Sequence, residues 1–279
     1  MLSILYGILS AATWGAGDFA GGLSSRKVGP YRAVFYADFF GLLILILASI
    51  IYRETLPSTS GWINSLLGGA LGSFGLLILY YSLSIGQMSI AAPVSALFAA
   101  LLPVIVGAIT EGLPSAIQLI GFALALAAVW LISQGDAGFH ISQLSDLRLP
   151  ILAGVGFGCY FIFIHSAVGD PNSFLWPMII SRVAGTVLVF FIVLARRETF
   201  PVPRDAWGVV FFNATLDLAG NFFYILASKT GRLDIAAILS SLYPGTTVIL
   251  AWLLLKEHVS RTQVVGILLA FTAIFLFTI

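Results

Sequence analysis

The chain has 279 residues, of which 59% are hydrophobic and 9% are charged, and its formal net charge is +1. A soluble domain carries roughly 25% charged residues, so this composition excludes a water-facing globular surface and predicts an integral membrane protein. The near-neutral charge gives no indication of a nucleic-acid partner, and the single cysteine, Cys159, excludes an intrachain disulfide framework.

Ten apolar runs of about 20 residues follow one another, each long enough to cross roughly 30 Å of hydrocarbon as a helix. We expect spans at 2–23, 31–52, 62–84, 88–109 and 115–134, and again at 149–168, 173–195, 206–228, 233–255 and 261–279. The first begins at Leu2 without a basic leader, which favours a retained span over a signal peptide. The runs do not alternate apolar and polar residues, which excludes the spans of a β-barrel.

The two groups of five spans are related in sequence. Arg53-Glu54-Thr55-x-Pro57 recurs as Arg197-Glu198-Thr199-x-Pro201 at a spacing of 144, and the match continues at a spacing of 145. The later pairs include Trp62 with Trp207, Gly75 with Gly220, Gln118 with Gln263, and Gly121 with Gly266. The repeats are expected at 1–134 and 149–279, with 135–148 as the loop between them.

An odd number of spans in each repeat inserts the second repeat in the opposite sense. The sequence therefore predicts an all-α integral membrane protein of ten transmembrane helices, arranged as two inverted five-helix repeats. The loops after spans one, five, seven and nine hold nine Lys and Arg residues, and the opposite side holds three. The positive-inside rule then places both termini outside the cytoplasm.

Four charged residues fall inside the spans, where a charge is costly and usually faces the interior of the bundle. They are Asp18, Asp38, Arg182 and Asp217. Asp38 and Arg182 are 144 residues apart and occupy equivalent places in the two halves. Either they form salt bridges that fix the helices, or Arg182 anchors a carboxylate or phosphate of the substrate, because its planar fork matches such groups.

The sixth span aligns with the first at a spacing of 147, which pairs Trp14 with Phe161 and Asp18 with His165. Asp18 and His165 both titrate, so each is a candidate for proton coupling or for contact with the substrate. The alternative role for both is a hydrogen bond between packed helices.

The eighth span carries a polar stripe on one helical face, formed by Asn213, Asp217, Asn221 and Tyr224. A polar stripe cannot face lipid without large cost, so it faces a water-filled cavity or a partner helix. The equivalent third span carries Ser73, Tyr80 and Tyr81, and aromatic side chains beside a few polar groups suit an amphipathic small molecule. We expect one central cavity between spans one, three, six and eight, faced by Trp14, Asp18, Tyr81, His165, Asp217 and Asn221.

Several of these features resemble the EamA-type members of the drug/metabolite transporter superfamily. Trp14-Gly15-Ala16-Gly17-Asp18-Phe19 resembles the family's Trp-Gly opening, and a glutamate followed by Gln-x-x-Gly closes each repeat, at Glu111 with Gln118 and at Glu257 with Gln263. The resemblance covers essentially the whole chain and implies a ten-helix carrier of amino acids, sugars, nucleotide derivatives, drugs or other metabolites. Members of this family are usually drawn with both termini in the cytoplasm, opposite to the orientation that the basic residues predict.

We therefore expect a secondary active transporter, not an enzyme, in the cell (inner) membrane of a bacterium or archaeon. It would move a small metabolite related to an amino acid, a sugar or a nucleoside by alternating access, with protons as the candidate coupling ion. The alternatives are a channel, which needs a ring of repeated polar residues, and a sensor scaffold, which needs an appended soluble domain.

An intramembrane enzyme would need a compact His/Asp/Glu or Ser/His group. The chain has three histidines, of which His140 and His258 fall in loops, and it has no His-Glu-x-x-His pattern. No nucleotide-binding loop occurs either, so no cofactor is expected. The partners are the small-molecule substrate and the lipid bilayer, and the oligomeric state stays open.

Overall fold

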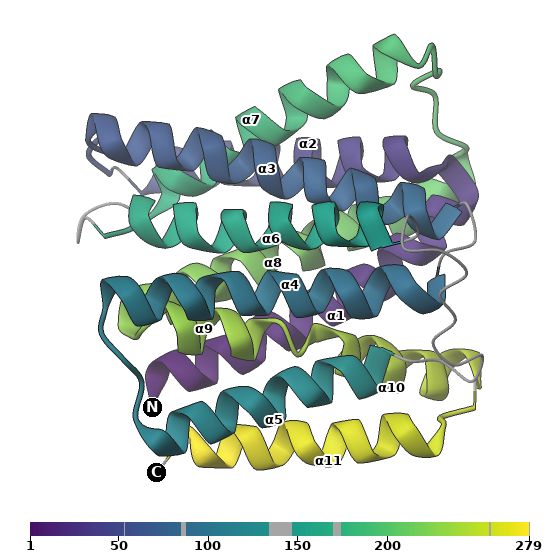
Figure 1. The fold of residues 1–279 in the computed structure, drawn as a ribbon. Coiled ribbons are helices and arrows are strands. Elements are labelled where there is room, and N and C mark those ends of the chain that lie inside the picture. Colours follow the sequence, from purple (N-terminus) through teal and green to yellow (C-terminus); the bar gives the residue numbers. More distant parts are fainter. Residues whose placement is uncertain (53, 85–87, 134–146, 170–173, 257, 279) are drawn as a thin grey trace.

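The computed structural model describes residues 1–52, 54–84, 88–133, 147–169, 174–256 and 258–278. Arg53, His140 and Glu257, which belong to the patterns above, lie outside the described residues. The first half consists of α1 (Leu2–Val28), α2 (Pro30–Ile51), α3 (Thr59–Ser84), α4 (Met88–Thr110) and α5 (Ala116–Ser133). The second consists of α6 (Arg148–Ala167), α7 (Leu175–Ala195), a 3₁₀ turn η2 (Arg204–Ala206), α8 (Trp207–Thr230), α9 (Leu233–Ser240), α10 (Tyr243–Leu255) and α11 (Arg261–Leu276) (Figure 1).

Nine of the ten predicted spans are single helices in the described residues, and the ninth is divided into α9 and α10. Pro244 occupies the first turn of α10 and has no N–H to donate, so the helix cannot continue through it with full hydrogen bonding. The N–H of Ser241 donates to the carbonyl of Ala237 and that of Leu242 to Leu239, which closes α9 with a short turn. The break lies in the middle of the span, at the depth of the polar groups described below.

The helices have the length and surface of membrane spans. Among the described residues, seven helical segments are long and apolar enough to cross a bilayer, and two shorter apolar helices, Val94–Thr110 and Arg261–Leu276, accompany them. α1 has 27 residues, which is about 40 Å of helix. Large apolar side chains on the outside are exposed, as contact with lipid requires: Ile51 is 77% exposed and Phe271 64%. The chain is therefore an all-helical membrane protein.

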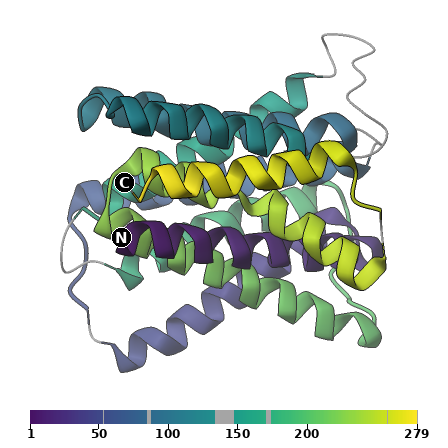
Figure 2. The same ribbon diagram turned by 90° about the horizontal axis from the view of Figure 1, so that it is seen from below.

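The two halves pack as an inverted pair. α1 of the first half lies along α8 of the second, and α6 lies along α3 in the equivalent way. α2 packs on α7, α4 on α9, and α5 on α11, so each of these pairs joins a helix to its own counterpart. Both termini lie at the same end of the bundle (Figures 1 and 2), which we call the terminal end.

The pair formed by α5 and α11 explains the Gln-x-x-Gly pattern. Ser260 and Gln263 form a capping box at the start of α11, in which each side chain binds the backbone N–H of the other residue, and Ser115 and Gln118 do the same before α5. Each pattern thus starts a helix, and its glycine then lets the two helices approach closely. A Cβ at Gly121 would lie 2.8 Å from Phe277.

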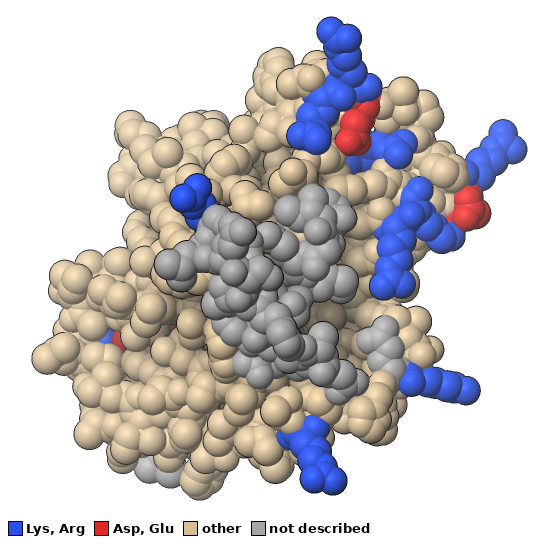
Figure 3. Space-filling model, turned by 45° about the vertical axis from the view of Figure 1, so that its right-hand side comes forward, with Lys and Arg blue, Asp and Glu red and all other residues tan. Residues whose placement is uncertain are grey.

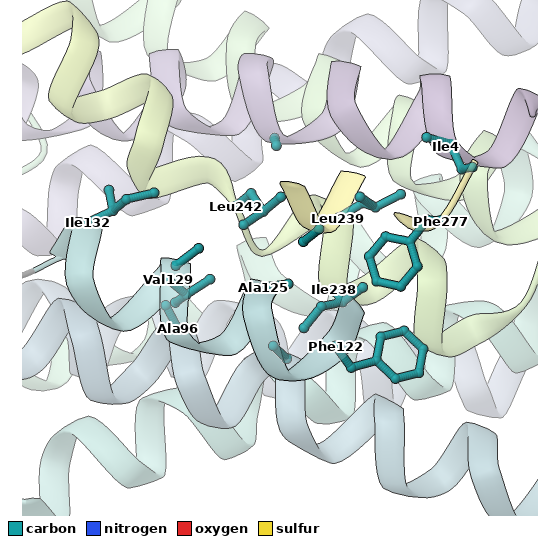
Figure 4. Packing of buried hydrophobic residues seen from close by; sticks show 14 residues of the cluster. Ile4, Ala96, Phe122, Ala125, Val129, Ile132, Ile238, Leu239, Leu242 and Phe277 are labelled. Carbon is teal, nitrogen blue, oxygen red and sulfur yellow. The ribbon is translucent and has the colours of Figure 1, made fainter. Parts of the chain in front are cut away.

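The equivalent glycine behaves in the same way, since a Cβ at Gly266 would lie 2.8 Å from Ile132. Phe277 also packs on Phe122, with ring centroids 5.2 Å apart. Figure 4 shows these side chains in the buried cluster that α5 shares with α9 and the C-terminal segment. The contact between α5 and α11 is therefore tight and apolar, and it lies away from the polar residues of the spans.

The end opposite to the termini, where α1, α3, α5, α7 and α10 finish, carries most of the charge (Figure 3). We call it the basic end; its Lys and Arg residues are Arg26, Lys27, Arg32, Arg148, Arg196, Arg197, Arg204, Lys256 and Arg261. Lys27 pairs there with Asp205 at 3.0 Å, and this pair holds the pKa of the exposed Asp205 carboxyl below its usual value. Among the described residues the terminal end holds Lys229 and Arg232. The cytoplasmic location of the basic end stays a prediction.

Candidate functional site

A cavity lies in the middle of the bundle, between the two halves. Its lining residues come from both halves, on α1, α2, α3, α4, α6, α7, α8 and α10. Its polar and aromatic lining consists of Trp14, Asp18, Asp38, Ser73, Phe157, Tyr160, Phe161, Ser181, Arg182, Asp217, Asn221 and Tyr243. Six of the predicted site residues therefore meet here: Trp14, Asp18, Asp38, Arg182, Asp217 and Asn221.

Arg182 is the centre of the charged side of the cavity. Its Nη1 lies 2.6 Å from Oδ1 of Asp38, and its Nη2 lies 2.5 Å from Oδ2 of Asp217. The second oxygen of Asp38 accepts a hydrogen bond of 2.8 Å from Ser73. Arg182 is 7% exposed and Asp38 is 4% exposed, so both charges are removed from water and depend on each other for compensation. Of the two roles considered for Arg182, this geometry is that of a salt bridge between helices, since the guanidinium is paired with the carboxylates of Asp38 and Asp217.

The charge balance of the lining is negative. Asp18, Asp38 and Asp217 face a single guanidinium, that of Arg182, among the described lining residues. Asp18 forms no ion pair among the described residues, and it lies one helical turn from Trp14 on α1. An anionic ligand would meet repulsion here, whereas a proton, a cation or a ligand with hydroxyl donors would find acceptors.

Aromatic rings form another wall of the cavity. The ring of Trp14 lies 5.6 Å from that of Phe161 and 6.4 Å from that of Tyr160. Tyr160 donates its hydroxyl to Oδ1 of Asn221, and Asn221 donates from Nδ2 to the carbonyl of Asp217 at 2.7 Å. The polar stripe of α8 is thereby connected to α6, and both ends of the Asn221 amide are engaged, the oxygen by Tyr160 and the nitrogen by the backbone of α8.

Three of the other predicted residues are packed against helices beside the cavity. Tyr224 is fully buried, its ring lies 5.9 Å from that of Trp14, and its hydroxyl donates to the carbonyl of Phe161 at 2.7 Å. Asn213 and Tyr80 are also buried, and both point at α1, where a Cβ at Gly21 would lie 2.4 Å from the Tyr80 hydroxyl and 3.2 Å from Oδ1 of Asn213. These three side chains support the cavity walls from behind.

The sequence predicts that His165 faces the central cavity, but the structure places it in a second polar cluster, at the terminal end. Its Nε2 lies 3.0 Å from Oε1 of Glu111, which directly follows α4, and its Nδ1 lies 2.6 Å from Oγ of Ser228 on α8. The carboxylate of Glu111 also accepts the N–H of Leu233 at 3.1 Å, and so caps the first turn of α9. Arg232 donates to the carbonyl of Glu111 at 3.2 Å. This terminal cluster joins four helices of both halves.

Tyr81 is also placed elsewhere. It lies at the basic end in a groove with Tyr31 and Arg196 and is 37% exposed. The expected single cavity therefore holds Trp14, Asp18, Asp217 and Asn221 but neither Tyr81 nor His165.

Sequence reasoning missed the roles of two glutamates and one tyrosine. Glu54, in the repeated Arg-Glu-Thr-x-Pro pattern, accepts the N–H groups of Phe174 and Leu175 at 3.1 and 2.7 Å, and so caps α7 of the other half. Glu111 caps α9 in a similar way. Tyr160 stands next to Phe161, which aligns with Trp14, so the alignment of the first and sixth spans could have indicated it.

In the described parts of the chain, no group of three or more His, Cys, Asp or Glu residues could hold a metal ion. The chemistry that the described cavity offers is that of carboxylates, one guanidinium, an amide, hydroxyls and aromatic faces.

The chain is similar to several known membrane proteins. The EamA-like transporter family matches residues 1–134 and again residues 147–279. "Putative sugar uptake protein" sequences from Streptococcus pyogenes serotypes M1 and M3 are 22% identical over 279 residues, covering 94% of this chain and 92% of theirs.

An uncharacterised protein of Methanocaldococcus jannaschii is 28% identical over 133 residues, which is 48% of this chain and 93% of that protein. A crystal structure of a protein with 16% sequence identity superposes with a TM-score of 0.81, covering 99% of this chain and 96% of that one, and it shows the same fold. Two matches to one family, one in each half, together span nearly the whole sequence. The chain therefore belongs to the EamA-like transporter family.

Proposed function

We propose that the protein is a secondary active transporter that moves a small polar metabolite across the membrane by alternating access. The observation that carries this proposal is the central cavity, which lies between two inverted halves and gathers the charged residues of the spans. In transporters built from inverted repeats, the substrate binds near the midplane and the halves exchange conformations around it. A channel would need a continuous polar path, and the aromatic wall at Trp14 and Phe161 interrupts the described lining.

A sugar-like compound is the first candidate substrate. Sugars present hydroxyl groups that donate to carboxylate and amide oxygens, and the lining offers both at Asp18, Asp217 and Asn221. Their apolar ring faces pack on aromatic side chains, which Trp14 and Tyr160 provide. The Streptococcus pyogenes relatives are named for sugar uptake. Amino-acid-like and nucleoside-like compounds are the other classes to test.

Protons are the candidate coupling ion, and Asp18 is the candidate carrier. Asp38 and Asp217 share the guanidinium of Arg182, which offsets one unit of their combined charge. Asp18 lines the same cavity and forms no ion pair in the described structure. A carboxylate in that position can bind a proton in one conformation and release it in the other when its exposure to water changes.

The alternating step needs a closure at each end of the cavity. At the terminal end, the packed aromatic rings of Trp14, Phe161 and Tyr224 lie first, and the Glu111–His165–Ser228 contacts lie beyond them. Breaking these contacts would separate the ends of α4, α6 and α8, which come from both halves. We therefore assign the terminal cluster to the closed side of the conformation described here.

The decisive experiment is uptake into proteoliposomes. Purified protein is reconstituted, and accumulation of labelled sugars, amino acids and nucleosides is measured with and without a pH gradient. Accumulation of one class above the level in empty liposomes, increased by the gradient, is the expected result. Asp205→Asn, an exposed change at the basic end outside the cavity, is the matched control for Asp18→Asn. Flux that never exceeds equilibration under any gradient would overturn active transport and favour a channel.

The proposed location is the cell membrane of a bacterium or archaeon. It is supported by the helical spans and by relatives from Streptococcus pyogenes and Methanocaldococcus jannaschii.

A further inference from the structure

A second hollow lies at the basic end between α2, α3 and α7. Its rim consists of Tyr31 at the start of α2, Tyr81 near the end of α3, and Arg196 directly after α7. Its floor is apolar and consists of Phe74, Leu77, Ile78 and Ile192. We call it the interfacial groove; it shares no lining residue with the central cavity.

The groove runs from the membrane surface into the apolar layer. Tyr81 and Phe74 are seven residues apart on α3, which is about 10 Å along the helix. Tyr81 is 37% exposed and Phe74 43%, so the groove opens on the outer surface of the bundle. In a membrane protein this surface faces lipid, so the molecules available to fill the groove are the lipids of the adjoining leaflet.

The rim carries a positive charge in a fixed place. The guanidinium carbon of Arg196 lies 4.4 Å from the centre of the Tyr31 ring, a cation–π contact that holds the side chain over the groove. Arg196 forms no ion pair with a described carboxylate, and the sequence Arg196-Arg197-Glu198 has a net charge of +1. Its N–H donors are therefore available to an outside acceptor, in a geometry that suits phosphate.

We propose that the interfacial groove is a binding site for an anionic phospholipid. The phosphate would lie against Arg196 at the rim, and one acyl chain would lie along Phe74, Leu77 and Ile192. The apolar floor excludes a polar solute, and the rim charge selects an anionic headgroup over a zwitterionic one. The location at the basic end agrees with this choice, because anionic lipids gather at the surface toward which basic loops are oriented.

Occupancy of the groove would bear on the central site. The groove is built from α2, α3 and α7, which also carry Asp38, Ser73 and Arg182. Phe74, on the floor of the groove, directly follows Ser73, and the hydroxyl of Ser73 donates a hydrogen bond to Asp38. A lipid in the groove would therefore hold together the helices on which the charged side of the cavity depends.

The test is lipid binding by the full-length protein in detergent, followed by native mass spectrometry and thermal unfolding. The ligands are phosphatidylglycerol, phosphatidylcholine with the same acyl chains, and inorganic phosphate alone. We expect phosphatidylglycerol to bind and to raise the Tm, phosphatidylcholine to do so less, and free phosphate to have no effect. Equal effects of the two lipids, or an effect of phosphate alone, would overturn the proposal.

Two variants in the groove and one control outside it localise the effect. Arg196→Gln should lower the affinity for phosphatidylglycerol about tenfold, since a charge-assisted hydrogen bond is lost. Arg204→Gln removes the same charge from an exposed residue at the same end and should leave binding unchanged. Ile78→Trp fills the floor without changing the charge and should also weaken binding. If Arg196→Gln and Ile78→Trp both bind like Arg204→Gln, the lipid lies elsewhere and the proposal is wrong.

Discussion

Nη1 of Arg182 and Oδ1 of Asp38 lie 2.6 Å apart, although each residue occupies the place in its own half that the other occupies in the opposite half. The contact between Asp38 and Arg182 therefore lies on the pseudo-two-fold axis that relates the two repeats. Two identical halves would bring together two carboxylates or two guanidinium groups here, and like charges repel strongly when buried. The pair can form only because the two repeats differ at this position.

Removing Arg182 should destabilise the protein by about 3–5 kcal/mol, because Asp38 and Asp217 would remain buried without their partner. Arg182→Met is the test, with the Tm of purified protein in detergent as the measurement. The triple variant Arg182→Met, Asp38→Asn, Asp217→Asn should recover most of the loss, since no buried charge remains. If the triple variant is as unstable as Arg182→Met, the charges do not cause the loss.

Asp18→Asn should abolish accumulation driven by a pH gradient and leave exchange of bound substrate largely intact, because asparagine cannot carry the proton. Asp217→Asn should lower stability as well, since it also breaks a contact of 2.5 Å with Arg182. Both variants are compared for transport per folded molecule and for Tm. Undiminished accumulation in Asp18→Asn would end the coupling hypothesis for this residue.

Glu111→Ala should open the terminal end more often, because it removes the partner of His165 and the cap of α9. A reporter cysteine at Ser181, which lines the central cavity, is introduced together with Cys159→Ala. Labelling by an impermeant thiol reagent from the terminal end should be faster in the Glu111→Ala background. Asp205→Ala, at the basic end, should not change the rate. Equal labelling rates in the Glu111→Ala and Asp205→Ala backgrounds would show that the terminal cluster does not close this end of the cavity.

Gly121→Ala should cost about 1–3 kcal/mol of stability, because the added methyl group would lie 2.8 Å from the Phe277 ring and force the helices apart. Gly266→Ala should act in the same way against Ile132. Gly22 and Gly208 are matched controls, since a Cβ at either position meets nothing within 4 Å. Unfolding is followed by circular dichroism in detergent. A loss no larger than that of the controls would show that α5 and α11 can separate freely.

The orientation can be measured with a single cysteine. Arg204→Cys with Cys159→Ala places an exposed thiol at the basic end, and Leu113→Cys, whose native side chain is 86% exposed, places one at the terminal end. Arg197 is less suitable because its φ of 56° is strained for a cysteine. Intact cells should label Leu113→Cys and not Arg204→Cys. The reverse pattern would give both termini to the cytoplasm and contradict the positive-inside prediction.

The spans and their grouping into two inverted repeats followed from the sequence, because hydropathy and repeated motifs report directly on membrane crossing. The site followed only in part. Asn213, Asp217 and Tyr224 share one face of α8, as their spacing predicts, but only Asp217 of these three lines the cavity. α1 covers Asn213 at Gly21, and the carbonyl of Phe161 covers the hydroxyl of Tyr224. Periodicity predicts which residues share one face of a helix. Which of these residues line a cavity depends on where the neighbouring helices separate, and that is decided by their packing.

His165 illustrates the same limit. Its alignment with Asp18 is sound in sequence, yet α6 ends two residues after His165, whereas α1 continues for ten residues beyond Asp18. Equivalent places in the two halves therefore lie at different depths. The roles of Glu54 and Glu111 could not be predicted from one sequence either, because each caps a helix of the opposite half.

The contact between α5 and α11 has a consequence for how such a chain can arise. Gly121 against Phe277 and Gly266 against Ile132 are one contact made twice, which is the defining property of an isologous interface. A single five-helix polypeptide, inserted in both directions, could form this interface with a second copy of itself. The Methanocaldococcus jannaschii relative, of which 93% matches 48% of this chain, has about that length. The single chain thus resembles an antiparallel pair of five-helix units joined into one polypeptide, in which the two units carry different charges at the shared axis.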